Sequence, residues 1–380
     1  MPDNTLHPPR GHVHYFDYLR IMATVCVVFM HTAAECLRST TGLHWELLNI
    51  CTSFAFTAVP LFLMMSGYLL LSNPRTAGIS FLLRKRLPRL VLPLASWTAI
   101  AALQLLIARE NLHLRPFLSM MVQSFHDPIA IHLWYMYLMI ALYVVSPILY
   151  AAVNALDHNG KRYLLALIGL VTLHAIAAAL LPDRLDKLIA FDLIGKLKIY
   201  SGHLCTFILG WYLGTAEKRI PNRVLLPLAA ALWAVIILGT RFLTLQNGEY
   251  TSTFQSQSAG FEVVFAACLF LLFKQNANKA SRLLRAVPVV PLCLPIYLMH
   301  NIYLARIHIL GHYPAGFRGV TAMTAVVLVV CYFTVKTAAT IKPLCYLLTG
   351  MTYQDACRTC NWVYTFRNIK NLVTRHSNES

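Results

Sequence analysis

The sequence predicts an all-α integral membrane protein, a polytopic bundle of about ten transmembrane helices with both termini in the cytoplasm. Of its 380 residues, 58% are hydrophobic and only 12% are charged, which excludes a disordered chain and an ordinary soluble enzyme. The mean hydropathy is +0.59, yet the net charge is +17, so the apolar and the basic residues must occupy different places. Apolar runs near the length of a spanning helix, about 20 residues, recur along the chain.

We interpret ten apolar runs as spanning helices. They lie near residues 15–36, 50–72, 88–108, 131–153, 162–181, 200–216, 222–242, 260–274, 288–310 and 320–346. The runs at 200–216 and 260–274 are the shortest or most interrupted. The polar start, Met1 to His14, has no signal-peptide pattern, so the first run is expected to stay as an anchor. We therefore expect a transmembrane domain over residues 1–350 and a short basic cytoplasmic tail over 351–380.

The basic residues indicate the orientation of the chain. With the N-terminus in the cytoplasm, the cytoplasmic loops hold roughly twice as many Lys and Arg residues as the loops on the other side, as the positive-inside rule requires. An even number of spans agrees with two cytoplasmic termini. Because this rule accounts for the basic excess, we expect membrane lipid and no nucleic acid among the partners.

The cysteines indicate neither a disulfide framework nor a metal site. Most of the ten lie inside apolar runs, where Cys behaves as a small hydrophobic residue. Cys357 and Cys360 have CxxC spacing, but the chain has no second pair and no histidines at zinc-finger spacing. We therefore expect no bound metal.

Four ionisable residues lie in the first apolar run: Asp17, Arg20, His31 and Glu35. Such groups cost roughly 2.5–3.5 kcal/mol each inside a span, so they suggest function. In a helix, His31 lies about 20° around the axis from Arg20 and about 16 Å along it. Glu35 follows His31 by one turn. We expect a polar stripe turned away from lipid, with Arg20 near the cytoplasmic side and His31 in the outer half.

Each member of this stripe has two interpretations. Asp17 and Arg20 could form an interfacial ion pair, and for Asp17 this interpretation is favoured over catalysis. For His31 we favour a general base over a buried structural histidine, because an imidazole suits proton transfer near neutral pH. Glu35 is either the group that orients His31 or a simple helical neighbour.

A second cluster, FLLRKRLPRL at residues 81–90, holds Arg84, Lys85, Arg86 and Arg89 just before the third span. Positive-inside anchoring explains any basic loop. The same side chains would also suit a phosphorylated ligand, because arginine offers paired donors that match phosphate oxygens. Composition alone leaves both interpretations open.

Aromatic and histidine residues mark two further segments, IHLWYMYL at 131–138 and PIYLMHNIY at 295–303. Tyr and Trp at a span boundary are typical of an aromatic belt, so we interpret His132 as an interfacial residue. His300 lies about 20 Å into its span, at a depth like that of His31, which favours a functional role.

These segments resemble the acyltransferase-3 family of membrane O-acyltransferases. FDYLRIMATVCVVFMHTA resembles the opening of the family, whose signature is an Arg, ten residues and a His, and Arg20 and His31 fit this spacing. Later segments are similar to its second span (VPLFLMMSGYLLL, 59–71), its Arg-x-x-Arg motif (RLPR, 86–89), its fourth span (132–149) and its late Tyr/His segment (LPIYLMHNIYL, 294–304). Ile21 and Met22 stand where the family usually has Gly.

The resemblance implies transfer of an acyl group, most simply acetyl, from cytoplasmic acyl-CoA to a hydroxyl of an envelope glycan or lipid-linked saccharide. It places the protein in the bacterial inner membrane, in O-acetylation during polysaccharide biosynthesis, with acyl-CoA as co-substrate and no bound cofactor. The residues that it implies are His31, Arg20 and Glu35 for catalysis, and Arg86, Arg89, Trp134, Tyr297 and His300 for substrate binding.

The alternative function is an exporter or flippase of a polysaccharide or small molecule. Intramembrane Arg, His and Glu also fit a proton-coupled pathway. The sequence contains no internal repeat of the kind common in transporters, which weighs against this alternative. Transfer of labelled acetyl from acetyl-CoA by the purified protein would separate the two functions.

Overall fold

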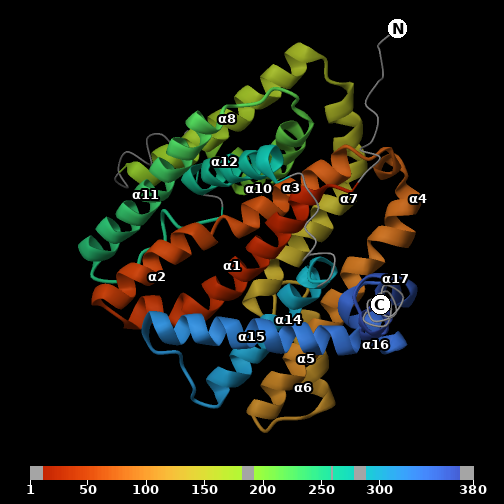
Figure 1. The fold of residues 1–380 in the computed structure, drawn as a ribbon. Coiled ribbons are helices and arrows are strands. Elements are labelled where there is room, and N and C mark those ends of the chain that lie inside the picture. Colours follow the sequence, from red (N-terminus) through yellow and green to blue (C-terminus); the bar gives the residue numbers. More distant parts are fainter. Residues whose placement is uncertain (1–11, 182–191, 258–259, 278–287, 369–380) are drawn as a thin grey trace, which may run out of the picture. The chain divides into compact units, whose positions relative to one another are not determined.

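The computed structural model describes residues 12–181, 192–257, 260–277 and 288–368, with the backbone alone for 192–201 (Figure 1). Helices take up most of these residues, and no strand occurs among them. The predicted all-α class is therefore confirmed. Residues 369–380 of the predicted tail lie outside the described residues.

The helices follow one another with short connections. Their bounds are α1 His14–Ser39, α2 Gly42–Ala55, α3 Ala58–Leu71, η1 Pro74–Ala77, α4 Ile79–Phe81, η2 Leu82–Arg86, α5 Pro88–Ala108, α6 Leu114–Gln123, η3 Ile131–Leu133, α7 Trp134–Ala155, α8 His158–Leu180, α10 Asp192–Thr215, α11 Asn222–Asn247, α12 Gly260–Asn276, η4 Val290–Leu292, α14 Cys293–Ile309, α15 Gly316–Ala338, α16 Lys342–Thr349 and α17 Tyr353–Thr359.

Within the described residues, eight helical segments are long and apolar enough to cross a membrane. They correspond to eight of the ten predicted runs, so the polytopic membrane bundle is confirmed. The predicted runs at 200–216 and 260–274 form α10 and α12, which are helical but are not among the eight. Within the described residues α12 has 17 residues, at the lower end of the length that a span needs.

Two predicted runs are interrupted in the structure. The run at 50–72 breaks between α2 and α3 at Phe56 and Thr57, because Pro60 has no N–H for the carbonyl of Phe56. The run at 320–346 breaks between α15 and α16, because Pro343, in the first turn of α16, has no N–H for the carbonyl of Ala339.

The chain forms two compact units, and the division falls within α4, α7 and α15. The first unit holds residues up to 79 together with 145–279 and 316–320. The second holds 80–144, 280–315 and 321–380.

In the first unit, α3 and α10 pack with their backbones in contact (Figure 1). A Cβ on Gly67 would lie 1.7 Å from the carbonyl oxygen of Phe207, and a Cβ on Gly210 would lie 2.1 Å from that of Met64. Gly210 and Gly214 form a GxxxG pair, a motif that lets helices approach closely in lipid, where packing replaces the hydrophobic effect as the driving force. These glycines hold α10 against α3.

A buried polar network ties the loop after α11 to α2. The amide nitrogen of Gln255 donates to Asn49 Oδ1 and to Ser53 Oγ, each at 2.8 Å, and the Tyr250 hydroxyl donates to Gln255 Oε1 at 2.6 Å. Gln255, Asn49 and Ser53 are almost fully buried. Burial raises the pKa of Tyr250, so its hydroxyl stays protonated and remains a donor.

In the second unit, α5 packs against α14 and α16. The indole N–H of Trp97 donates to the carbonyl of Leu348 at 2.9 Å, and the Gln104 amide donates to the carbonyl of Ile302 at 3.0 Å. Gly350 follows α16 in the left-handed conformation, with φ +69°, and a Cβ there would lie 2.2 Å from the carbonyl oxygen of Arg89. Only glycine satisfies both constraints.

Candidate functional site

The first predicted site lies on α1, in the first unit. Arg20 and His31 lie on one unbroken helix, so the shared face and the separation of about 16 Å that the sequence predicted follow from helix geometry. Both side chains are half-buried. The guanidinium carbon of Arg20 lies 5.9 Å from the centroid of the Phe16 ring, a cation–π contact that holds Arg20 on the first turns of the helix.

At the two ends of the polar stripe on α1, Asp17 and Glu35 have ionic partners that were not predicted from the sequence. Among the described residues the ionic partner of Asp17 is His12, with Nε2 and Oδ2 2.5 Å apart, so the expected pairing of Asp17 with Arg20 is wrong. The carboxylate of Glu35 lies 3.7 Å from Arg38, and both side chains are more than half exposed. Such a surface pair contributes little. Orientation of His31 by Glu35 stays a prediction.

The second predicted site is a cavity of about 460 Å³ in the second unit, which we call the arginine cavity. Both Arg86 and Arg89 line it. Its other lining residues are Phe81, Lys85, Leu90, Tyr143, Pro291, Leu294, Thr349, Gly350 and Met351. The structure thus brings together the two arginines that the sequence singled out and surrounds them with mainly apolar side chains.

Local backbone geometry presents the arginines. Residues 82–86 form a π-helical turn, in which the N–H of Leu87 bonds to the carbonyl of Leu82 at 2.9 Å. Pro88 then occupies the first turn of α5, where its missing N–H costs nothing. A π turn shifts the side chains that follow it around the helix axis, and such turns are frequent at functional sites.

The contacts that the two arginines make in the structure are weak enough for a phosphate to replace them. The Arg86 guanidinium carbon lies 5.5 Å from the Phe81 ring centroid. The carboxylate of Asp355 lies 3.7 Å from Arg89, and each of the two side chains is about half exposed. Two guanidinium groups and one ammonium group lining a cavity can bind a polyanion through charge-assisted hydrogen bonds.

A third group of predicted residues lies at the start of α14, also in the second unit. Tyr297 and His300 are buried there, together with His132 from η3. The Tyr297 hydroxyl donates to the carbonyl of His132, the Nε2 of His132 lies 3.1 Å from the carbonyl of Leu298, and the two imidazole centroids are 5.0 Å apart. These residues form one connected cluster.

The hydrogen bonds of His300 define its tautomer. Its Nδ1 lies 2.6 Å from the carbonyl oxygen of Tyr297, and a carbonyl oxygen only accepts, so Nδ1 carries the proton in the neutral ring. The lone pair is then on Nε2, the nitrogen that would accept a proton or a hydrogen bond.

Trp134 joins this cluster through Tyr135. The centroids of the Trp134 and Tyr135 rings are 6.2 Å apart, and those of Tyr135 and Tyr297 are 5.6 Å apart, both in edge-to-face geometry. The predicted binding residues of the second unit therefore fall into two groups. Arg86 and Arg89 line the arginine cavity, whereas Trp134, Tyr297 and His300 belong to the aromatic cluster.

Sequence reasoning missed two contributions. His132 was interpreted as interfacial, but it is 1% exposed and packs against His300. The available signal for a role of His132 in the site was its position two residues before Trp134, a predicted binding residue. The segment 349–351 and Asp355 reach the arginines from the far end of the chain, and nothing in their sequence signals this contact.

A second cavity, of about 470 Å³, lies in the first unit. Tyr68, Tyr150, Lys161 and Trp211 are among the residues that line it, and the ammonium of Lys161 lies 5.9 Å from the centroid of the Trp211 ring. None of the predicted site residues lines this cavity.

Comparison with known proteins identifies the family. The family model described as an acyltransferase domain, the acyltransferase-3 type, matches residues 13–336. No curated protein and no solved structure matches the chain. The matched range includes Arg20, His31, the two cavity arginines and the aromatic cluster, and it covers most of the chain. The chain therefore belongs to the acyltransferase-3 family and is a membrane acyltransferase.

Proposed function

We propose that the protein transfers an acyl group, most simply acetyl, from cytoplasmic acyl-CoA to a hydroxyl of a cell-envelope glycan or lipid-linked saccharide, in the inner membrane of a bacterium. The observation that carries the proposal is the arginine cavity. In a membrane acyltransferase, a cavity lined by Arg86, Arg89 and Lys85 suits a donor that carries several phosphates, as CoA does.

The walls of the cavity support the same donor. Phe81, Leu90, Pro291 and Leu294 offer apolar surface beside the cations. A CoA molecule combines phosphate groups with an adenine ring and a long, weakly polar pantetheine arm. The cavity offers cations for the phosphates and apolar surface for the adenine ring and the pantetheine arm. It therefore matches CoA better than it matches a small inorganic anion.

The chemistry requires a base and a hydroxyl acceptor. We assign the base to His31, which would take the proton of the acceptor hydroxyl as its oxygen attacks the thioester carbonyl. Collapse of the tetrahedral intermediate then forms the ester, breaks the carbon–sulfur bond and releases CoA as thiol or thiolate. Trp134, Tyr297 and His300 are the residues that we expect near the saccharide, and Arg20 the one that we expect near the donor arm.

Sided vesicles test the proposal. We expect labelled acetyl-CoA supplied only on the face that carries the C-terminal tail to modify a saccharide acceptor enclosed on the other face. The reason is that CoA is too polar to cross the membrane, whereas its arm is long enough to enter the protein. Transport of unmodified acceptor without any labelled product would instead favour the exporter. Transfer only when both substrates share the tail-bearing face would contradict the outward-reached acceptor.

Removing the cavity arginines should weaken donor binding. We expect Arg86→Ala combined with Arg89→Ala to raise the KM for acyl-CoA about tenfold or more with a smaller change in kcat, because contacts remote from the thioester contribute mainly to binding. Steady-state kinetics of the purified variant measure this effect.

Arg84→Ala is the matched control, because Arg84 belongs to the same basic segment but is not among the residues that line the cavity. If the segment only anchors the topology, removal of Arg84 should lower expression or alter orientation as much as removal of the other two. In that case the KM for acyl-CoA would be the same in all variants, and the proposed donor site would be wrong.

A further inference from the structure

We propose that His12, His14 and Asp17 form a binding site for a divalent transition metal ion, zinc by its donor set, at the start of α1. The proposal does not depend on the acyl donor or the acceptor. The expectation of no bound metal rested on the cysteine pattern, and it overlooked a His-x-His-x-x-Asp sequence of which all three members meet in the structure.

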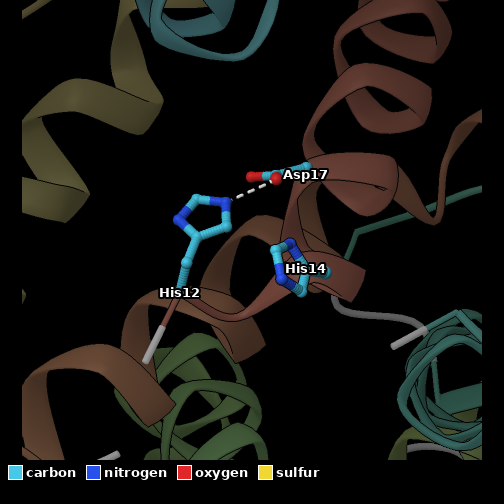
Figure 2. Close-up of side chains that lie close together, drawn as sticks. All are labelled: His12, His14 and Asp17. Atoms are coloured by element: carbon cyan, nitrogen blue, oxygen red, sulfur yellow. Dashed lines mark hydrogen bonds and ion pairs between the residues drawn. The ribbon is translucent and has the colours of Figure 1, made fainter. Parts of the chain in front are cut away.

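The geometry brings three ligand atoms together. One side-chain atom from each residue lies within 4.8 Å of the other two, and Figure 2 shows the His12 and His14 rings beside the Asp17 carboxylate. In a tetrahedral zinc site, with bonds of about 2.0–2.2 Å, neighbouring ligand atoms are roughly 3.3–3.6 Å apart. Side-chain rotations that move the ligand atoms by about an ångström would bring the atoms that are still too far apart to the spacing of a zinc site.

The donor set selects the class of metal. Two imidazole nitrogens and one carboxylate oxygen are typical of zinc and of similar transition metals, whereas calcium and magnesium prefer oxygen ligands throughout. Three protein ligands leave a fourth position for water or for an added ligand.

The Asp17 carboxylate provides an independent reason for a cation. Asp17 is 9% exposed, and its Oδ1 has no hydrogen-bond partner among the described residues. Its ionic partner there is His12, which is charged only when it is protonated. A buried carboxylate with so little compensation is costly, and a metal dication would neutralise it.

The backbone supports two of the ligands. His14 and Asp17 are three residues apart on α1 and therefore lie on one face of its first turn. Tyr15 and Phe16, which lie between them, are buried and fix this turn. The His12 side chain is 60% exposed, precedes the helix, and can rotate toward a metal. The partial positive charge of a helix N-terminus opposes a cation, so binding should require all three ligands.

Metal content tests the proposal directly. The whole protein, purified in detergent with a tag that contains no histidine, would be stripped with EDTA, exposed to excess Zn²⁺ and freed of unbound metal. We expect inductively coupled plasma mass spectrometry to find about one zinc per chain. We expect at least tenfold less in His14→Gln and in Asp17→Asn. Cobalt substitution should give visible absorption bands typical of tetrahedral coordination.

Two further variants make the result decisive. His113→Gln changes an exposed histidine that is not a member of the cluster and should keep the zinc, which controls for adventitious binding by other histidines. His12→Gln alters the most exposed ligand and should lose the zinc even if the changes at His14 or Asp17 disturb folding. Absence of zinc from the unmodified protein, or equal zinc in all folded variants, would overturn the site.

Discussion

Replacing His31 by alanine is expected to lower the rate of acyl transfer by about two to four orders of magnitude, the usual contribution of a general base. His31 is half-buried on α1 and shares a helix face with Arg20. Because we assign it to the acceptor hydroxyl and assign the donor phosphates to Arg86 and Arg89, the same variant should bind acyl-CoA as tightly as the unmodified protein does.

The measurement is single-turnover transfer from labelled acetyl-CoA, with donor affinity determined separately on the same preparation. His113→Ala is the control, since His113 lies in an exposed loop and belongs to no predicted site. Near-normal transfer by well-expressed His31→Ala protein would refute the assignment. If His300→Gln lost transfer while His31→Ala kept it, the base would instead be His300, whose Nε2 carries the lone pair.

A large effect on stability is expected at Gly210. A Cβ there would lie 2.1–2.4 Å from three backbone atoms of Met64, and backbone cannot move aside as a flexible side chain can. Gly210→Ala should therefore force α3 and α10 apart. Overpacking of this kind typically costs about 1–3 kcal/mol, and sometimes more. We expect less folded protein and a lower midpoint of thermal unfolding in detergent.

Gly169→Ala is the matched control. Gly169 is also in a helix, α8, but a Cβ there would meet nothing within 4 Å. This substitution should leave the unfolding midpoint unchanged or raise it slightly, because alanine favours helix over glycine. If both variants unfolded at the same temperature as the unmodified protein, backbone contact would not be what holds α3 to α10.

The helices were predictable because a span needs a long apolar run, and each of the ten runs is helical in the structure. The breaks at 56–57 and after Ala338 were not predicted, since hydropathy does not register a missing backbone donor. Pro60 and Pro343 were the signals for them. The GxxxG pair at Gly210 and Gly214 was readable in the sequence too, but its partner helix was not.

The types of residue in the candidate site were predictable from the sequence. Which of these residues contact one another was less predictable. Arg86 and Arg89 share a cavity because they lie one turn apart, which sequence spacing indicates. The pairing of His132 with His300 joins η3 to α14, and the pairing of Asp17 with His12 involves a residue outside the apolar run. Contacts of these two kinds depend on tertiary packing, which the local sequence pattern does not specify.

The contact between Gly350 and Arg89 has a consequence for biosynthesis. A ribosome makes residues 81–90 long before it makes 349–351, and both segments line the arginine cavity. A nascent chain that has inserted its early spans therefore possesses both arginines but only part of the cavity around them. On the proposed function, donor recognition should arise late in translation, after α16 has emerged and packed against α5. Unfinished chains in the membrane would then lack the complete site that we propose for acyl-CoA.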